Sequence, residues 1–388
     1  MKDGIPYSYP SLQENTKADV TVVGSSISGA LVTWYLVNAG LKVVVIDRRH
    51  AAMGSTAAST SLLQYEIDTP MHVLADRVGL QNAARSYQLC LESIFKLRKL
   101  FSEDIKTDFE EVPSLQYASF DSHIKGLRKE FELRKQHSFN VEWLEKAEIN
   151  RLFKLDAPAA ILSQNAAGMD AYQATHSLLQ ECQKMDCAIY DNTEVVAIDH
   201  HRDKVTLTTD TGATIRSKQL VLACGYETVK YIPKKIADLH STYALVTEPL
   251  TKDKIWHKRS LVWETATPYL YFRITKDNRI LMGGKDDFFY DPVKRDAAVK
   301  RKAGLIEKAF YKKFTGIDIR TDFRWAGTFA TTKDGLPYIG SIRQRPNTYF
   351  ALGFGGNGIT YSLIAAEILC DMIAGRKNAD AAIFSFDR

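Results

Sequence analysis

The stretch DVTVVGSSISGALVTWYLVNAGLKVVVID, residues 19–47, decides the fold of this chain. Two runs rich in β-branched residues, 19–23 and 42–47, lack the polar alternation of half-exposed strands and predict parallel strands buried on both faces. A helix is predicted between them, over residues 28–38, and glycine and serine interrupt the apolar run where turns are needed. The stretch is therefore predicted to be a strand–helix–strand unit of the Rossmann type, not a membrane-spanning helix.

The turn after the first strand has the residues of a dinucleotide site. Gly24 and Gly29 have the fingerprint spacing, and the N–H groups and dipole at the helix start favour an anion such as a pyrophosphate. Asp47 ends the second strand, where an acid accepts a hydrogen bond from a ribose hydroxyl. Ser26 stands where the fingerprint has its middle glycine. The Cβ of this serine is expected to crowd the place where the backbone approaches the phosphates most closely. The predicted binding residues here are Gly24, Ser25, Ser26, Ile27, Ser28, Gly29, Asp47, Arg48 and Arg49.

Two further segments suit a flat cofactor. Residues 54–63 are mostly small or hydroxylated, which lets backbone approach a ligand closely while supplying donors. Residues 353–360 form a glycine-rich turn that opens a helix, whose N–H groups stabilise negative charge. Taken alone, each is equally compatible with a plain loop. The predicted contacts are Ser55, Thr56, Ala57, Ala58, Ser59, Thr60, Leu62, Leu63, Gly353, Gly355, Gly356, Asn357, Gly358, Ile359 and Thr360.

Length and composition exclude several classes of protein. A net charge of +5 over 388 residues, without basic runs interleaved with aromatics, excludes a nucleic-acid partner. Five scattered cysteines without a CxxC pair predict neither a disulfide framework nor a metal site. The first residues lack the apolar core of a signal peptide, so a cytoplasmic location without an integral membrane segment is expected. Composition leaves the oligomeric state open.

The pattern of elements predicts two domains built from discontinuous segments. Both ends of the chain have α/β character, and a strand-rich, antiparallel-looking block lies between them. The predicted nucleotide domain comprises residues 1–78, 166–225 and 325–388, and the substrate domain comprises 79–165 and 226–324. One long helix is predicted over residues 70–101, because apolar residues recur there at helical spacing.

The ordered motifs together resemble one known family. Besides the segments above, they comprise residues 221–225, 271–284 and 325–340. The sequence resembles the FAD-dependent amine and amino-acid oxidoreductases of the D-amino-acid-oxidase superfamily, which includes glycine oxidase, sarcosine oxidase and gamma-glutamylputrescine oxidase. The resemblance implies an α/β fold: a Rossmann-type FAD-binding domain and a second α+β substrate domain built on a mixed, largely antiparallel sheet.

The resemblance also implies how FAD is held and what it does. Val195 and Val196 are expected to contact the adenine, and the segment from Ala223 through Cys224 to Gly225 is expected to lie near the diphosphate and ribose. Gly327 is also expected to contact FAD. It stands where some relatives attach the flavin through a cysteine, so FAD is expected to be bound non-covalently. The implied reaction transfers a hydride from a C–H bond beside nitrogen to flavin N5 and leaves an imine.

Departures from the family pattern bear on the substrate. Phe329 and Gly356 stand where amino-acid-oxidising relatives carry carboxylate-binding arginines, and Thr360 stands where oxygen-activating relatives carry a lysine. A simple α-amino acid is therefore disfavoured, and use of oxygen stays open. Strand alternation places residues 269, 271 and 273 on one face. The predicted catalytic residues are Tyr269, Tyr271, Arg273 and Asn357, with Phe329 and Lys333 nearby.

Three alternatives remain at this point. The first is an oxidase or dehydrogenase acting on the C–N bond of a small amine or amino-acid-like substrate. The second is a dehydrogenase of a C–OH substrate, and the third is a flavin-binding, non-catalytic subunit of a redox complex. Arg273 is equally compatible with a structural ion pair.

Overall fold

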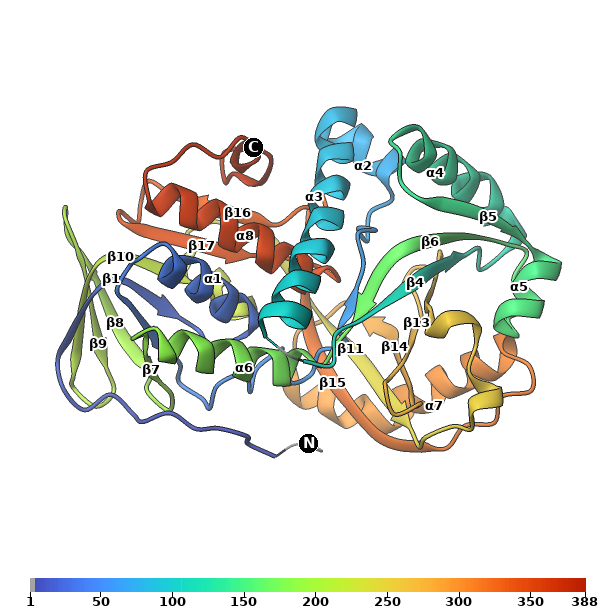
Figure 1. The fold of residues 1–388 in the computed structure, drawn as a ribbon, viewed down its shortest axis with the longest axis horizontal. Coiled ribbons are helices and arrows are strands. Elements are labelled where there is room, and N and C mark those ends of the chain that lie inside the picture. Colours follow the sequence, from blue (N-terminus) through green and yellow to red (C-terminus); the bar gives the residue numbers. More distant parts are fainter. Residues whose placement is uncertain (1–3, 106) are drawn as a thin grey trace.

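The computed structural model describes residues 4–105 and 107–388, in which the strands form two sheets. Sheet A lies on the left of Figure 1 and sheet B on the right, with helices packed against both. The chain passes between the sheets several times, because strands from both the N-terminal and the C-terminal thirds enter each sheet.

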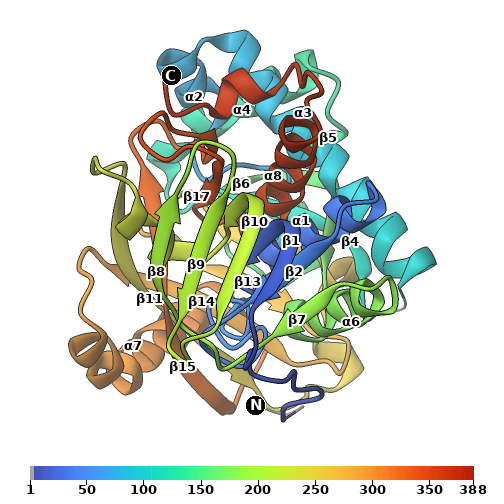
Figure 2. The same cartoon turned by 90° about the vertical axis from the view of Figure 1, so that its left-hand side faces the viewer.

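Sheet A contains the Rossmann unit predicted from residues 19–47. Its parallel strands lie in the order β17, β10, β1, β2 and β7, with β16 antiparallel at one edge. An antiparallel hairpin, β8–β9, extends from β10, and Figure 2 shows β8, β9, β10, β1, β2 and β7 side by side. The strands are β1 (Thr16–Val23), β2 (Val43–Ile46), β7 (Ala188–Tyr190), β8 (Val195–His200), β9 (Val205–Thr209), β10 (Thr214–Leu222), β16 (Tyr338–Ser341) and β17 (Thr348–Leu352).

Sheet B is antiparallel except where β12 pairs with β4. Its order is β15, β11, β14, β13, β12, β4, β6 and β3, and β5 also pairs with β6. The strands are β3 (Leu62–Leu63), β4 (Glu110–Tyr117), β5 (Val141–Glu145), β6 (Ala159–Gly168), β11 (Ala237–Thr247), β12 (Leu261–Glu264), β13 (Tyr271–Ile274), β14 (Ile280–Asp287) and β15 (Thr321–Thr332).

Helices bury one face of each sheet. The largest core cluster packs α1, α3, α6 and α8 against sheet A, and a second packs α5 and α7 against sheet B. The α-helices are α1 (Ile27–Asn38), α2 (Met71–Val78), α3 (Leu80–Arg98), α4 (Ile124–Gln136), α5 (Lys146–Phe153), α6 (Ala171–Lys184), α7 (Pro292–Lys313) and α8 (Gly358–Ile373). The shorter turns are η1 (Lys99–Asp104), η2 (Asp121–His123), η3 (Gly225–Tyr231), η4 (Lys252–Lys254), η5 (His257–Arg259) and η6 (Ala381–Phe384).

A buried charge network fixes the segment between β3 and α2. Arg134 on α4 is fully buried; its Nε donates to Glu130 Oε1 at 2.9 Å, and its Nη1 lies 3.8 Å from Glu66 Oε1. Glu130 in turn accepts from the backbone N–H of Met71 at 3.0 Å, at the start of α2. Burial alone would raise the pKa of Glu130, but Arg134 and the hydrogen bonds outweigh it and lower that pKa to about 2. The network therefore tethers residues 66–71 to α4.

The fold class predicted from the sequence is confirmed, and several details differ. The single helix predicted over residues 70–101 is divided at Gly79, whose φ of 83° is a left-handed conformation that favours glycine. Strand β13 begins at Tyr271, so Tyr269 precedes the strand on which it was predicted to lie. Strand β15 continues to Thr332, so the domain boundary predicted at residue 325 falls inside it. The division into two domains stays a proposal.

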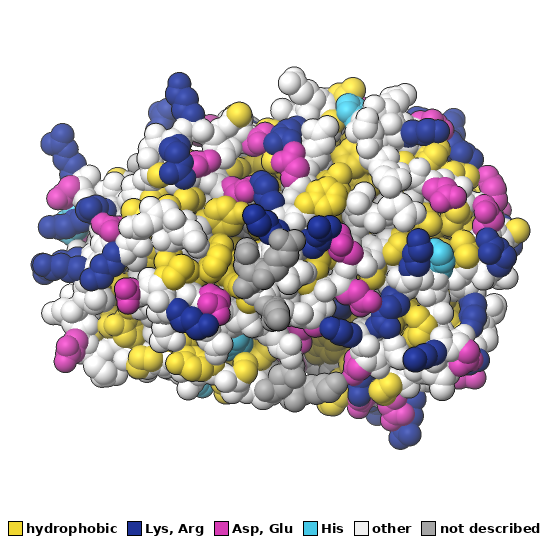
Figure 3. Space-filling view, in the orientation of Figure 1, with side chains coloured by type: hydrophobic (Ala, Val, Ile, Leu, Met, Phe, Trp, Pro, Cys, Tyr) yellow, Lys and Arg dark blue, Asp and Glu magenta, His cyan; other side chains and the backbone are white. Residues whose placement is uncertain are grey.

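The surface and the helices bear on possible partners. Figure 3 shows basic and acidic side chains interspersed over the face it presents, without a continuous basic field. Across the residues described, no helix combines the length and the apolar character needed to cross a bilayer.

Candidate functional site

The turn between β1 and α1 requires glycine at both fingerprint positions. Gly24 has a φ of 107°, and a Cβ there would lie 2.5 Å from the carbonyl oxygen of Ala223. A Cβ on Gly29 would lie 1.8 Å from the carbonyl oxygen of Gly24. Both distances are far shorter than a van der Waals contact, so helix α1 can start directly against β1 only with glycine at these positions.

Asp47 shapes this turn from the end of β2. Its Oδ2 accepts from both the backbone N–H and the hydroxyl of Ser25, each at 2.8 Å, and its Oδ1 accepts from the N–H of Arg49 at 3.0 Å. A carboxylate oxygen accepts more than one hydrogen bond, so Asp47 retains acceptor capacity for a ribose hydroxyl. The neighbouring Arg48 and Arg49 bond to Glu227 at 2.7 and 3.1 Å on the exposed surface.

The serine that replaces the middle glycine has a structural role. Ser26 is the N-cap of α1; its Oγ accepts from the N–H of Gly29 at 3.5 Å and donates to the carbonyl of Ala223 at 3.3 Å. Thr56 Oγ1 accepts the N–H of Ile27 at 3.1 Å, which brings the loop of residues 54–63 against the start of α1. The first two predicted cofactor segments are therefore in contact.

The glycine-rich turn lies at the same edge of sheet A as this turn. Strands β1 and β17 are both parallel to β10, and α1 and α8 each follow the carboxyl end of one of them. Ser28 on α1 and Ser362 on α8 join the helices through a 2.6 Å hydrogen bond. Gly353 and Gly355 have φ values of 79° and 56°. Two helix N-termini therefore meet at the carboxyl edge, where open α/β sheets bind dinucleotides.

The other predicted cofactor residues come from β8, from the end of β10 and from β15. The N–H of Thr193, just before β8, bonds to the carbonyl of Asp47 at 2.9 Å, so the segment leading to Val195 and Val196 adjoins the end of β2. Cys224 Sγ donates to the carbonyl of Val23 at 3.3 Å. Gly327 on β15 is paired with Thr242 on the neighbouring strand β11. Whether each residue touches the cofactor stays a prediction.

Asn357 positions a neighbouring segment. Its Nδ2 donates to the carbonyls of Gln64 at 3.1 Å and Glu66 at 2.8 Å, and the residue is 6% exposed. The side chain is thus committed to holding the chain that follows β3. These contacts are those of a positioning residue, and the predicted catalytic role of Asn357 stays a prediction.

Tyr269 and Tyr271 lie together where sheet B meets the glycine-rich turn. Tyr269 Oη donates to Asp68 Oδ1 at 2.9 Å, and the N–H of Gly356 donates to Asp68 Oδ2 at 2.7 Å. The two tyrosine rings are 5.9 Å apart, and Tyr271 lies over Gly283, where a Cβ would be 2.2 Å from its hydroxyl. Burial raises the pKa of both tyrosines, that of Tyr271 to about 12, so both hydroxyls stay protonated at neutral pH.

Two carboxyl groups raise the pKa of these tyrosines through their charge. Asp286, near the end of β14, has a buried Oδ1 without a hydrogen-bond partner among the described residues. Burial, reinforced by the charge of Asp68, raises its pKa to about 6, although a hydrogen bond to Thr242 lowers it. Desolvation also raises the pKa of Asp68, against its bonds to Gly356 and Tyr269, although the residue remains exposed to solvent.

Arg273 is not part of this group. It shares a face of β13 with Tyr271, since Phe272 and Ile274 point into the opposite core, but it packs against Gly168 on β6. Burial lowers the pKa of Arg273, and the carboxyl groups of Asp108, Asp170 and Glu110 act against that shift. Its buried Nε has no hydrogen-bond partner among the described residues, so neither the structural ion pair nor the predicted catalytic role is established, and both stay predictions.

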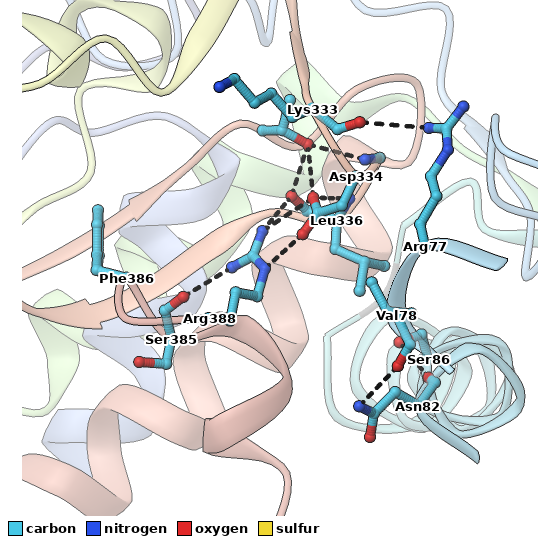
Figure 4. A network of polar contacts seen from close by, with 12 residues as sticks. Arg77, Val78, Asn82, Ser86, Lys333, Asp334, Leu336, Ser385, Phe386 and Arg388 are labelled. Atoms are coloured by element: carbon cyan, nitrogen blue, oxygen red, sulfur yellow. Dashed lines mark hydrogen bonds and ion pairs between the residues drawn. The ribbon is translucent and has the colours of Figure 1, made fainter. Parts of the chain in front are cut away.

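The other two residues predicted nearby, Phe329 and Lys333, contact other groups. The ring of Phe329 is 5.2 Å from that of His240, and the carbonyl of Lys333 accepts from Arg77 at 3.5 Å (Figure 4).

The loop that carries Lys333 is held by an ion pair. Arg388 Nε donates to Asp334 Oδ2 at 2.7 Å, and Arg388 Nη2 donates to the carbonyl of Leu336 at 2.8 Å (Figure 4). Gly335, with a φ of 89°, lies against the segment before α2, since a Cβ there would be 2.3 Å from Thr69 Oγ1. The loop therefore supports the backbone next to Asp68.

A family model described as "FAD dependent oxidoreductase" matches residues 19–372. The chain belongs to this family. Gamma-glutamylputrescine oxidoreductase of Escherichia coli is 23% identical, with 95% of this chain and 86% of the relative covered. A putative Rieske 2Fe-2S iron-sulfur protein of Bacillus subtilis, YhfW, is also 23% identical, covering 98% and 73%. The crystal structure of glycine oxidase from Geobacillus kaustophilus superposes with a TM-score of 0.82 at 19% identity, covering 96% and 99%.

This FAD-dependent oxidoreductase has residues that fit its cofactor. The two glycines that exclude a Cβ, the acid at the end of β2 and the two converging helix N-termini match the needs of a dinucleotide. The resemblance to the D-amino-acid-oxidase superfamily is thereby confirmed, as is FAD as the cofactor. FAD supplies two-electron redox chemistry when bound.

Sequence reasoning missed two acidic residues whose charge acts on Tyr269 and Tyr271, namely Asp68 and Asp286. Asp68 follows the small-residue loop without any periodic pattern, and Asp286 is the first of two consecutive acids at the end of a strand. Only the missing arginine at Gly356 hinted that another group occupies that position.

Proposed function

We propose that this FAD-dependent oxidoreductase oxidises the C–N bond of a small amine. The observation that carries the proposal is the group formed by Tyr269, Tyr271 and Asp68 against the glycine-rich turn. It supplies hydrogen-bond donors and acceptors that suit an amine, and a side chain on Gly356 would clash with it. Relatives named for amine and amino-acid substrates support the same class.

The residues assist the reaction by binding and by handling protons. An amine delivers a hydride from the carbon beside nitrogen only when its lone pair is free, so the ammonium ion must first lose a proton. Asp286 is ionised above about pH 6, and we assign it the role of accepting a hydrogen bond or a proton from the substrate. The protonated tyrosines can orient the substrate by donating hydrogen bonds. The imine that leaves is hydrolysed by water to a carbonyl compound and ammonia.

The loop of residues 54–63 connects the dinucleotide-binding turn of sheet A with β15 and Tyr271 of sheet B. Trp325 Nε1 on β15 donates to the carbonyl of Ala58 at 3.0 Å, and a hydrogen bond to Thr60 acts on the hydroxyl of Tyr271. These contacts support a site in which sheet B covers the flavin. We therefore place the substrate between β13 and the glycine-rich turn.

The test is anaerobic mixing of the oxidised, FAD-loaded protein with panels of primary amines, N-methyl amines, amino acids and 2-hydroxy acids. Loss of the flavin absorbance with amines is expected. Loss with hydroxy acids alone would move the enzyme to the C–OH class. No loss with any compound would refute substrate oxidation by this chain alone.

A further inference from the structure

Asp68 contributes a carboxyl group beside Tyr269 and Gly356. A Cβ on Gly356 would lie 2.6 Å from Asp68 Oδ1 and 2.8 Å from Tyr269 Oη. No side chain can therefore extend from residue 356 while Asp68 keeps its position. A carboxyl group of the protein takes the space into which a longer side chain at residue 356 would extend.

The position of Asp68 is fixed from two directions. Asn357 holds the preceding residues through the carbonyls of Gln64 and Glu66. Gly335 packs against Thr69, which follows Asp68 directly. With the hydrogen bonds from Gly356 and Tyr269, the carboxyl group is preorganised.

Among the described residues, no basic side chain forms an ion pair with the second carboxyl group, Asp286. Lys302 is the basic residue that acts on it, but Lys302 Nζ bonds at 2.6 Å to both the Lys285 carbonyl and Asp287 Oδ1. The charge of Asp286 acts on both Tyr269 and Tyr271, so it belongs to the same group of side chains. Its buried Oδ1 has an unused acceptor among the described residues.

We propose that Asp68 and Asp286 select a substrate with two amino groups and no carboxylate, that is, a short aliphatic diamine or a longer polyamine. One amino group stays an ammonium ion held by a carboxylate, while the other is deprotonated and oxidised. In that step the C–H bond breaks, and its hydrogen leaves for FAD as a hydride that carries both electrons of the bond. The nitrogen lone pair forms the C=N bond of an iminium ion, which loses a proton to give the imine. This inference rests on the proposed C–N oxidation and adds the charge of the substrate.

The aromatic walls agree with a cationic ligand. Trp263, Tyr269 and Tyr271 form a row of rings, with centroids 6.1 Å apart for the first pair and 5.9 Å for the second. Aromatic faces attract ammonium ions, most strongly where water is excluded. A carboxylate on the substrate would face two acids instead, and nearby like charges are unfavourable.

The experiment compares three four-carbon compounds with the FAD-loaded wild type: 1,4-diaminobutane, 1-aminobutane and 4-aminobutanoate. Rates of anaerobic flavin reduction over a range of concentrations give an apparent Kd and a limiting rate for each. We expect the diamine to bind at least tenfold more tightly than the monoamine, since one charge-assisted hydrogen bond corresponds to a factor of about ten or more. The aminobutanoate should bind most weakly.

Two variants assign the effect to the carboxyl groups. Asp68→Asn and Asp286→Asn should each bring the Kd of the diamine to within about threefold of that of the monoamine. The exposed Asp203→Asn, in the turn between β8 and β9, is the matched control and should keep the wild-type preference. Flavin content is measured in every variant, so loss of FAD is not mistaken for loss of selectivity.

The outcomes separate the two proposals. Reduction by 4-aminobutanoate as efficient as by the diamine would overturn the charge selection and leave C–N oxidation standing. A preference for the diamine that survives both substitutions would also overturn it. If neither these three compounds nor any other amine on the panel reduces the flavin, the proposed C–N oxidation itself is refuted.

Discussion

Replacing Asp286 by asparagine should stabilise the flavin-free protein at neutral and higher pH. Burial is the largest cause that raises the pKa of Asp286 from 3.8 to about 6. The folded protein therefore keeps a proton on this group up to about pH 6, whereas the unfolded chain loses it near 3.8. The contribution of this group to stability is thus fully present below pH 3.8 and is lost as pH rises to about 6.

The size of the effect follows from the same shift. At about 1.4 kcal/mol per tenfold change in proton affinity, a rise from 3.8 to about 6 corresponds to roughly 3 kcal/mol as an upper limit. An asparagine carries no charge at any pH, so Asp286→Asn should raise the free energy of unfolding by up to that amount at about pH 8. At about pH 4 the two proteins should have nearly equal stability.

The assay is urea unfolding followed by tryptophan fluorescence at about pH 4, 5, 6, 7 and 8, with Asp203→Asn as control. The difference between variant and wild type should grow between about pH 4 and 6 and then stay constant. A difference that does not change with pH would show that the carboxyl group is not desolvated. A destabilised variant at about pH 8 would show that its charge is compensated in the fold.

Four further outcomes are expected. Asp47→Ala should weaken FAD binding by about 1.5–3 kcal/mol or more, measured by flavin fluorescence titration, because it removes a charged acceptor and loosens the turn; affinity within twofold of wild type would contradict this. Gly29→Ala should purify without FAD, because its Cβ meets a backbone oxygen at 1.8 Å; a yellow protein would show that the turn can adjust. Arg134→Ala should lower the free energy of unfolding by about 3–5 kcal/mol, since Glu66 and Glu130 are left buried without their partner; a change under about 1 kcal/mol in urea titrations would disprove the network. Acid precipitation should release all FAD into the supernatant, and flavin in the pellet would refute non-covalent binding.

The cofactor half of the fold was predictable because its constraints are local. Gly24, Gly29 and Asp47 lie within one strand–helix–strand unit, and each is required by a contact inside that unit or with the adjacent strand. Buried parallel strands also differ in pattern from half-exposed ones, which made sheet A visible in the sequence. Ser26 departs from the fingerprint, but its hydroxyl caps the helix that the glycine would have opened.

The substrate half was predicted less well because its contacts join distant parts of the chain. Alternation correctly placed Tyr271 and Arg273 on one face of β13, but it could not show that β6 and its neighbouring acids cover Arg273. Asp68 meets Tyr269 and Gly356 across 201 and 288 residues. No local propensity encodes such a contact.

Positions 68 and 356 determine the charge of the site together. A Cβ at residue 356 would lie 2.6 Å from Asp68 Oδ1 and 2.8 Å from Tyr269 Oη, so any side chain there requires both groups to shift. In Gly356→Arg the new side chain would meet Asp68 and Tyr269, so the arginine fits only if both of these side chains move. If Asp68 selects the charge of the substrate as proposed, we expect substitutions at positions 68 and 356 to be coupled rather than additive.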